Sequence, residues 1–278
     1  MGNSINISGY LGRKVRYIEP PAGGCDADAQ SFITTAGIIN ATQVAAICQL
    51  VADLKSTGVW SLLNAIYPFV GGTSTTNSYN LKNPASYQIT WYGGVTHNSN
   101  GVTFNGVNSY GETYYNESLI ETFGDTHRAV YDRTATSDFG AQIGAQGAGG
   151  GYQRNMLTDN YIGTYYLDCY DALDNYGRLV GPTADSRAFW LMSRASLAAG
   201  GFKAYKNLIN IGTTAYANVG TQPDVTVYIG GLNSLNTLVI PTNHNLAFAS
   251  MGKGLNPTQA ADYYTAVQTF QTTLGRQV

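Results

Sequence analysis

The sequence predicts a mainly β protein: an antiparallel two-sheet sandwich, preceded by a short helical segment and followed by a single C-terminal helix. Three observations carry this prediction. Apolar residues recur with a helical period over residues 26–66, and short segments with a two-residue period follow from Tyr67 onward. Gly- and Asn-containing turns separate these segments, as is typical of sandwiches. Residues 257–274 then return to the helical period.

The C-terminal stretch gives the clearest local signals. Residues 225–229 and 246–250 alternate apolar and polar or small side chains, which predicts two strands. Asn256 as N-cap and Pro257 at the first helical position then begin a helix, which Gly275 ends. We expect its apolar stripe to pack on the preceding strands; the stripe consists of Tyr263, Val267, Phe270 and Leu274.

Helices are also predicted near the N-terminus. Asp26 or Asp28 caps a helix that ends at Gly37, and Asn40 caps a second helix that ends at Gly58. A third, short helix is predicted before Pro68 from its apolar residues Trp60, Leu63 and Ile66. We interpret the two aspartates as favourable charges at a helix N-terminus rather than as a metal site.

The rest of the chain is predicted to form strands and loops. Gly71 to Asn77 is interpreted as a loop because it is rich in Gly, Ser and Thr. The glycine-rich run 147–151 lacks the Lys-Ser/Thr of a phosphate-binding loop, which excludes nucleotide binding there. Further strands are predicted at residues 88–92, 102–104, 129–133, 139–143, 163–170, 188–194, 202–205 and 208–211.

Several of these stretches together resemble one known family. The strand VTVYIGG, the strand NLAFASMGKG and the helix QAADYYTAVQTFQTTL are similar to the end of concanavalin A-like (laminin-G-like) jelly-roll domains found in bacteriophage virion structural proteins. VTFNGVNSYGETYYN resembles the opening strands of such domains. The resemblance covers residues 25–278 and implies a helical segment (25–66) and a concanavalin A-like jelly roll with its C-terminal helix (67–278). Residues 1–24 precede it and are predicted to form an N-terminal docking arm.

Composition narrows the function classes. Charged residues make up 12% of the chain, against roughly 25% in typical soluble proteins, and the net charge is −2, so we expect no nucleic-acid partner. No apolar run reaches the ~18 residues that span a bilayer, and no signal peptide is recognised, so we expect synthesis in the host cytoplasm without membrane insertion. The odd number of cysteines and their spacing predict that Cys25, Cys48 and Cys169 are all reduced.

No catalytic pattern is found. The carboxylates do not follow the i, i+2, i+5 spacing of related glucanases, and we interpret six of them as exposed loop charges: Glu112, Glu117, Glu121, Asp168, Asp171 and Asp174. Each histidine stands alone in the sequence, so we expect no catalytic zinc at His97, His127 or His244. We therefore expect no enzyme activity, no metal ligands and no cofactor; the resemblance is compatible with one structural calcium ion held by distant loops.

Aromatic residues are the candidates for ligand contact, because Tyr and Trp stack on sugar rings and protein surfaces. Trp60 and Trp190 are interpreted as core residues. Strand alternation must turn about half of the clustered aromatic residues inward. The candidate ligand-binding residues are Trp91, Tyr92, Tyr165, Tyr166 and Tyr170, with Tyr161 in the same cluster.

The N-terminal segment 1–24 is predicted to dock on another protein chain. Its breaker cluster, residues 19–24, separates it from the first helix, and it contains too few large apolar residues to form a core. The predicted docking residues are Ile5, Ile7, Tyr10, Leu11, Arg13, Lys14 and Arg16.

The main hypothesis is a non-enzymatic virion protein of a tail fibre, baseplate, spike or capsid decoration. Its expected partners are other virion proteins, further copies of itself and host-surface glycans. The alternative hypothesis is a soluble carbohydrate-binding or carbohydrate-active module of the glucanase-lectin type. A purely structural role without a ligand is the third hypothesis. Fold resemblance alone does not choose among them.

Overall fold

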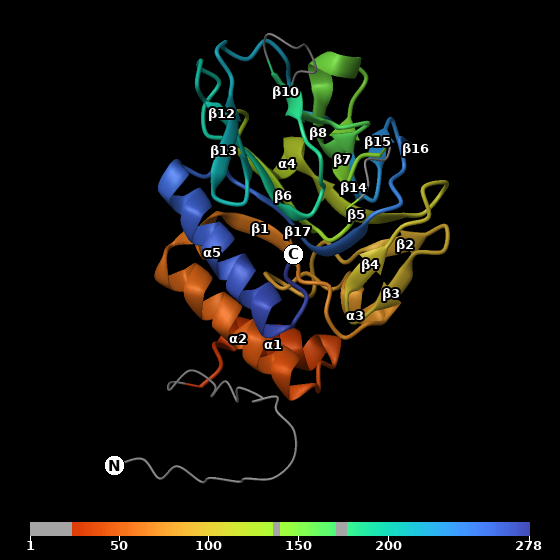
Figure 1. Ribbon diagram of the computed structural model, residues 1–278, viewed down its shortest axis with the longest axis vertical. Helices are drawn as coiled ribbons and strands as arrows, with labels where there is room; N and C mark the ends of the chain where they lie inside the picture. Colours follow the sequence, from red (N-terminus) through yellow and green to blue (C-terminus); the bar gives the residue numbers. More distant parts are fainter. Residues whose placement is uncertain (1–23, 136–139, 171–176) are drawn as a thin grey trace.

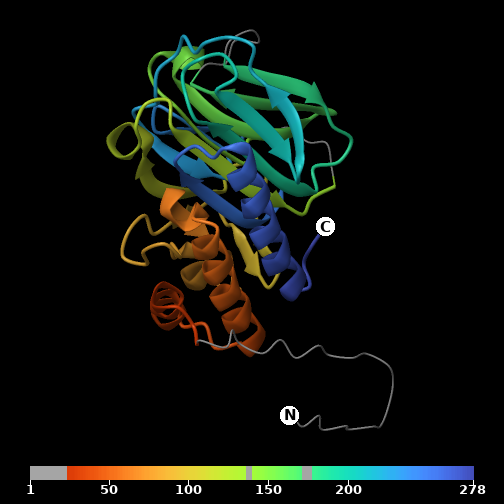
Figure 2. The same cartoon turned by 90° about the vertical axis from the view of Figure 1, so that its left-hand side faces the viewer.

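The computed structural model describes residues 24–135, 140–170 and 177–278 and shows two mainly antiparallel sheets packed face to face (Figure 1). Helices pack against one of these sheets, as the turned view shows (Figure 2). This architecture confirms the predicted β-sandwich with helices near both ends of the chain. Within the described residues, no helix has the length and apolar character needed to cross a bilayer.

The first sheet has eight strands in the order β13-β12-β11-β6-β17-β4-β3, and β1 pairs with β17 beside β4. Its strands are β1 (Leu63–Tyr67), β3 (Thr96–Asn98), β4 (Gly101–Thr103), β6 (Thr126–Asp132), β11 (Ala188–Arg194), β12 (Phe202–Lys206), β13 (Ile209–Thr213) and β17 (Asn245–Gly252).

The second sheet has nine strands in the order β10-β9-β8-β7-β14-β5-β2, with β15 and β16 attached beside β7. Its strands are β2 (Thr90–Tyr92), β5 (Tyr110–Asn116), β7 (Ile143–Gln146), β8 (Arg154–Tyr161), β9 (Thr164–Cys169), β10 (Arg178–Pro182), β14 (Thr226–Ile229), β15 (Leu232–Ser234) and β16 (Thr237–Val239).

Three helices are stacked on the eight-stranded sheet: α5 (Pro257–Thr273) packs on the sheet, α2 (Ala41–Ser56) packs on α5, and α1 (Ala27–Ala36) packs on α2. Their ends follow the predicted signals. The side chains of Asp26, Asn40 and Asn256 accept hydrogen bonds from the first turns of their helices. Short helices connect other elements: η1 (Val59–Leu62), α3 (Ser74–Ser78), α4 (Glu117–Ile120) and η2 (Gly150–Gln153).

The central strands of the eight-stranded sheet are buried on both faces. One face packs on the helices, with Tyr131, Phe189 and Phe248 among its residues. The other face packs on the second sheet, with Val130 and Trp190 among its residues. Every residue of β6 and β11 is consequently buried. Sheets covered on both faces lose the apolar-polar alternation of a half-exposed sheet.

The C-terminal residues lock the last helix onto the sheet. Arg276 is buried and donates hydrogen bonds to the carbonyl oxygens of Pro68, Phe69 and Ala247 at 2.7–2.9 Å. Burial lowers the pKa of Arg276 to about 9. This guanidinium therefore ties the end of α5 to the segment after β1 and to β17.

Some predicted elements are corrected. The short helix expected around Trp60, Leu63 and Ile66 is η1 followed by strand β1, because Leu63 and Ile66 face the helices while Ala65 faces the second sheet. A strand with apolar residues on both faces hides its period. Helices are also present outside the predicted ranges, as α3 and α4. Of the strand predicted at 139–143, residue 139 lies outside the described residues, and of residues 140–143 only Ile143 belongs to a strand, as the first residue of β7.

The cysteine prediction is wrong for two of the three residues. Cys25 and Cys48 form a disulfide that joins the start of α1 to α2, with a Cα–Cα distance of 5.1 Å. They are 23 residues apart in sequence, and the pairing of the two helices brings them together. Cys169 is free and buried, and burial raises the pKa of its thiol to about 11.

We predict that Phe270→Ala lowers the free energy of unfolding by about 3–5 kcal/mol, because a fully buried phenyl ring is removed from the contact between α5 and the sheet. Urea unfolding measures the change. Thr269→Ala, at an exposed position of the same helix, is the matched control and is expected to stay within ~0.5 kcal/mol. A loss below ~1 kcal/mol at Phe270 would show that the ring is not a core contact.

We predict that the double variant Cys25→Ser/Cys48→Ser is less stable than the oxidised chain by about 3 kcal/mol, the loop-closure contribution for a bridge of this span. Urea unfolding with and without a thiol reductant measures it. The reductant should destabilise the original chain and leave the double variant unchanged. Equal stability of the original chain under both conditions would contradict the disulfide.

Candidate functional site

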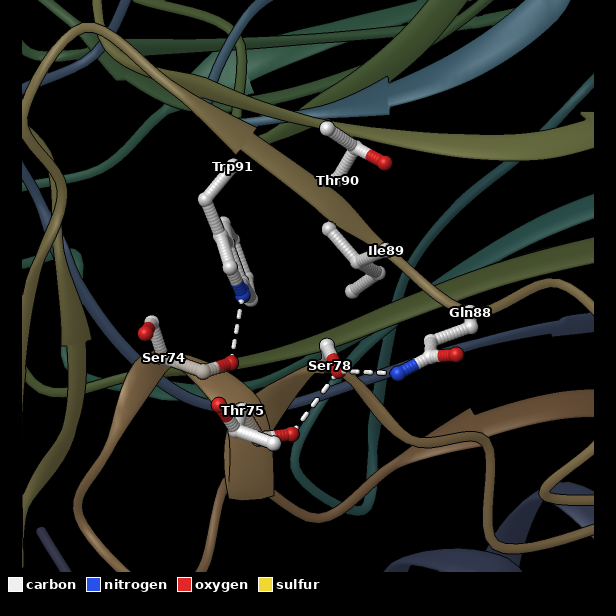
Figure 3. Close-up of a pocket in the computed structure, with 7 residues that line it drawn as sticks. All are labelled: Ser74, Thr75, Ser78, Gln88, Ile89, Thr90 and Trp91. Atoms are coloured by element: carbon white, nitrogen blue, oxygen red, sulfur yellow. Dashed lines mark hydrogen bonds between the residues drawn. The ribbon is translucent and has the colours of Figure 1, made fainter.

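An open pocket lies at the edge of the nine-stranded sheet, between the edge strand β2 and helix α3 (Figure 3). Its volume of ≈ 360 Å³ is at the lower end of the ~300–1,000 Å³ typical of small-molecule sites. Most of its side chains are hydroxyls or an amide, and none is charged. The pocket is lined by Ser74, Thr75, Ser78, Gln88, Ile89, Thr90 and Trp91.

The indole of Trp91 is the largest apolar group of this pocket, and its orientation is fixed. Its Nε1 donates a hydrogen bond to the carbonyl oxygen of Ser74 at 2.9 Å, across the pocket from β2 (Figure 3). Its ring packs edge-to-face on His97, with centroids 4.9 Å apart, and also contacts Phe69 and Phe104. The indole is only half-buried, so part of it remains available to a ligand.

Polar side chains form the opposite wall. The Ser78 hydroxyl donates to the carbonyl oxygen of Thr75 at 2.8 Å and accepts from Gln88 Nε2 at 3.0 Å. Ser78 itself is buried, whereas Thr75 and Gln88 are exposed. The wall therefore presents ordered hydroxyl and amide groups next to an aromatic ring (Figure 3).

A row of stacked tyrosines lies on the outer face of the same sheet. Tyr92 stacks on Tyr110 with centroids 4.9 Å apart, and Tyr110 stacks on Tyr228 at 4.4 Å. The row is linked to the pocket by Tyr114, whose hydroxyl donates to Thr90 Oγ1 at 3.0 Å. Because stacked rings cover one another, the free ring face is that of Tyr92 at the end of the row, which is 44% exposed.

The structure separates the five predicted ligand-binding residues. Trp91 and Tyr92 lie next to each other on β2 and reach the pocket and the tyrosine row respectively. Tyr166 is on β9, half-buried beneath the guanidinium of Arg178. Tyr165 and Tyr170 are buried in the core between the sheets, where Tyr165 packs on Trp190, so these two cannot contact a ligand.

Sequence reasoning missed the polar wall. Residues 74–78 were predicted as loop, yet they form α3, which Thr73 and Thr76 cap reciprocally through their side chains and backbone N–H groups. A capping box was the available signal, but its usual Glu or Gln at the third helical position is a threonine here.

Two of the carboxylates predicted to be exposed are buried beside a single arginine. Arg128, Glu117 and Glu121 have side chains with no exposed surface; the Arg128 guanidinium lies 2.7 Å from Glu117 and 3.3 Å from Glu121. The Tyr115 hydroxyl donates to Glu121 Oε1 at 2.5 Å. Burial raises the pKa of both carboxyls, that of Glu121 to about 8. The prediction of exposed charges failed because their partner, Arg128, lies on β6, and the spacing of the glutamates does not reveal this contact.

Asp168 is also buried rather than exposed. On β9 it accepts hydrogen bonds from Arg178 Nε and Nη2 at 2.7 and 3.0 Å, and Arg154 lies 3.5 Å away. These contacts are structural ion pairs across three neighbouring strands. Glu112 is half-buried beside the tyrosine row, and Asp171 and Asp174 lie outside the described residues.

The three histidines are far apart in the sequence, and the fold gives each of them close neighbours. His97 supports Trp91, and burial lowers its pKa. His127 is buried, with its pKa lowered by burial to about 3. His244 Nδ1 lies 2.6 Å from Asp132 Oδ2 and 3.7 Å from Asp159 Oδ1. The predicted docking arm lies outside the described residues, apart from Gly24.

Comparisons with known proteins concern the fold. No family model matches the chain. No curated protein matches it. A mutant of Trypanosoma rangeli sialidase displaying trans-sialidase activity superposes with a TM-score of 0.53 and 13% identity, over 81% of this chain and 39% of that one. A mutant of HCR/D superposes with a TM-score of 0.51 and 10% identity, over 74% of this chain and 52% of that one.

A third solved structure is the CBM40 of a Ruminococcus gnavus sialidase bound to α2,6-sialyllactose. It shares 14% identity, with a TM-score of 0.40, over 52% of this chain and 86% of that one. The chain thus spans about half or less of the two structures with the higher TM-scores. These two likenesses support the β-sandwich fold and, at such low identity, nothing finer.

We predict that Glu121→Gln changes the pH dependence of stability. The folded chain holds a proton on Glu121 up to about pH 8, whereas the unfolded chain releases it near the ordinary value of 4.5. This carboxyl therefore lowers stability progressively as the pH rises from about 4.5 to about 8, and glutamine does not. Urea unfolding at pH 5 and pH 8.5 measures this effect. The free energy of unfolding of the variant, relative to that of the original chain, should be higher at pH 8.5 than at pH 5. A pH-independent difference would contradict the buried, protonated state.

Proposed function

We propose that this protein is a non-catalytic carbohydrate-binding sandwich domain and that the pocket between β2 and α3 takes a sugar ring. The observation that carries the proposal is the fixed, half-buried indole of Trp91 facing a wall of hydroxyl and amide groups. Sugars offer an apolar ring face and a rim of hydroxyls, and this combination of an aromatic plane with neutral hydrogen-bonding groups matches both.

The charge of the pocket indicates neutral sugars. None of its seven lining residues is basic, so a carboxylated or sulfated sugar would find no cation there. We therefore do not propose sialic acid as a ligand of this chain, although some of the similar structures are sialidases. A neutral oligosaccharide reaching from Trp91 to the free ring face of Tyr92 is the ligand that the residues of β2 fit.

The absence of carboxylates among the lining residues supports binding without hydrolysis. Glycoside hydrolysis uses two carboxyl groups ~5–10 Å apart across the scissile bond. Glu117, Glu121 and Asp168, which could have supplied such groups, are buried against arginine side chains and do not line the pocket.

The virion role remains a prediction that rests on the sequence resemblance, and the solved neighbours lend it no support. Carbohydrate binding belongs to both hypotheses, because a virion protein can attach to host glycans. The neighbours agree better with the alternative, a carbohydrate-binding module, and the pocket is compatible with either setting.

We predict that Trp91→Ala weakens binding of a neutral oligosaccharide roughly tenfold or more, the loss expected when ~1.4 kcal/mol of stacking is removed. A glycan array identifies the oligosaccharide, and isothermal titration measures the affinity. Tyr166→Ala is the matched control, since this aromatic residue lies on β9, away from the pocket, and it should bind normally. Unchanged affinity in the Trp91 variant, or no glycan bound by the original chain, would refute the proposal.

A further inference from the structure

A second polar cluster lies inside the sandwich and joins its two sheets. Asp132 ends β6, and His244 directly precedes β17; both strands belong to the eight-stranded sheet. Asp159 is on β8 in the nine-stranded sheet. All three side chains are fully buried, at 0–1% exposure, so the cluster has no access to bulk water.

The contacts of this cluster leave one carboxylate without a donor. Asp132 is satisfied, because Oδ2 lies 2.6 Å from His244 Nδ1 and Oδ1 accepts the Thr134 N–H at 2.7 Å. Neither carboxylate oxygen of Asp159 accepts a hydrogen bond from an N–H or hydroxyl donor of the described residues, and its carboxyl faces that of Asp132 instead. Its backbone N–H donates to Gln142 Oε1. An ionised carboxylate in this position is strongly destabilising unless a positive charge joins it.

The three side chains can converge on one ion. Their ligand atoms all lie within 4.8 Å of one another. Small side-chain shifts of a few tenths of an ångström bring them within the ~4.4 Å that an ion with bonds of about 2.0–2.2 Å can span. Burial and the adjacent Asp132 carboxylate raise the pKa of Asp159, as expected for excess negative charge in one place.

We propose that Asp132, Asp159 and His244 bind one divalent transition-metal ion of the Zn²⁺ or Mn²⁺ class. The donor set of one imidazole nitrogen and two carboxylates suits these ions, whereas Ca²⁺ takes oxygen ligands. On binding, the proton between His244 Nδ1 and Asp132 leaves, and the nitrogen lone pair becomes a ligand. The ion then links the two sheets, which makes its role structural and independent of the sugar pocket.

The test begins with the full chain. It is stripped with EDTA, and Zn²⁺ or Mn²⁺ is then titrated in while elemental analysis by mass spectrometry and thermal unfolding are measured. The expected result is one ion per chain and a rise of several degrees in the unfolding midpoint, reversed by EDTA. The proposal is overturned if the stripped chain binds neither ion and its midpoint does not move; the cluster then holds a proton instead. The proposal is also overturned if Ca²⁺, but neither Zn²⁺ nor Mn²⁺, raises the unfolding midpoint.

Two matched variants locate the ion. Asp159→Asn keeps the shape of the side chain and removes a charged ligand, so it should lose the ion and its stabilisation. Asp168→Asn changes an equally buried carboxylate that two arginines already neutralise, so it should still bind one ion. Binding by Asp159→Asn equal to that of the original chain overturns the assignment. If a variant fails to fold, the titration of the original chain decides alone.

Discussion

The two-sided burial of β17 is the constraint on which the rest of the structure depends. On one edge β17 pairs with β6, and on the other with β4 and β1, so its hydrogen bonds hold the middle of the eight-stranded sheet. A register shift between Leu246 and Phe248 turns Phe248 toward α5 and leaves Leu246 facing the second sheet. The helices thus cover one face of this sheet, and the nine-stranded sheet covers the other.

This burial pattern explains what the sequence could predict about the fold. Strand β11 was predicted with its observed bounds, and helix α5 was predicted within one residue from its cap, stripe and stop. Strand β1 was mistaken for a helix because apolar side chains on both faces leave no two-residue period. The pairing of Cys25 with Cys48 depends on how α1 meets α2, and residue spacing carries no information on that contact.

The candidate sites were predictable only in part, for a related reason. Trp91 and Tyr92 were identified because adjacent large aromatic residues at the end of a predicted strand can stack on a ligand. Serines, threonines and a glutamine are too common to be identified in the same way. They gather beside the indole only because α3 packs next to β2 and the residues that lead into it. Glu117, Glu121 and Asp168 were misjudged because their arginine partners lie on other elements, β6 and β10. The contact between Asp132 and His244, which are 112 residues apart, was not predicted at all. Burial and charge neutralisation follow from topology rather than from spacing.

The two proposed sites divide the molecule according to solvent and charge. The pocket at Trp91 is on an edge strand, where water can leave and a ligand can enter, and its lining is uncharged. The cluster of Asp132, Asp159 and His244 lies on interior strands, where an unpaired charge is costly and an ion would stay bound. The Trp91 ring contacts Phe69, which Arg276 in turn holds through its carbonyl oxygen. The Arg276 hydrogen bond therefore helps to hold the indole in its orientation. The proposed sugar ligand would contact only the edge strand β2 and the adjacent helix α3.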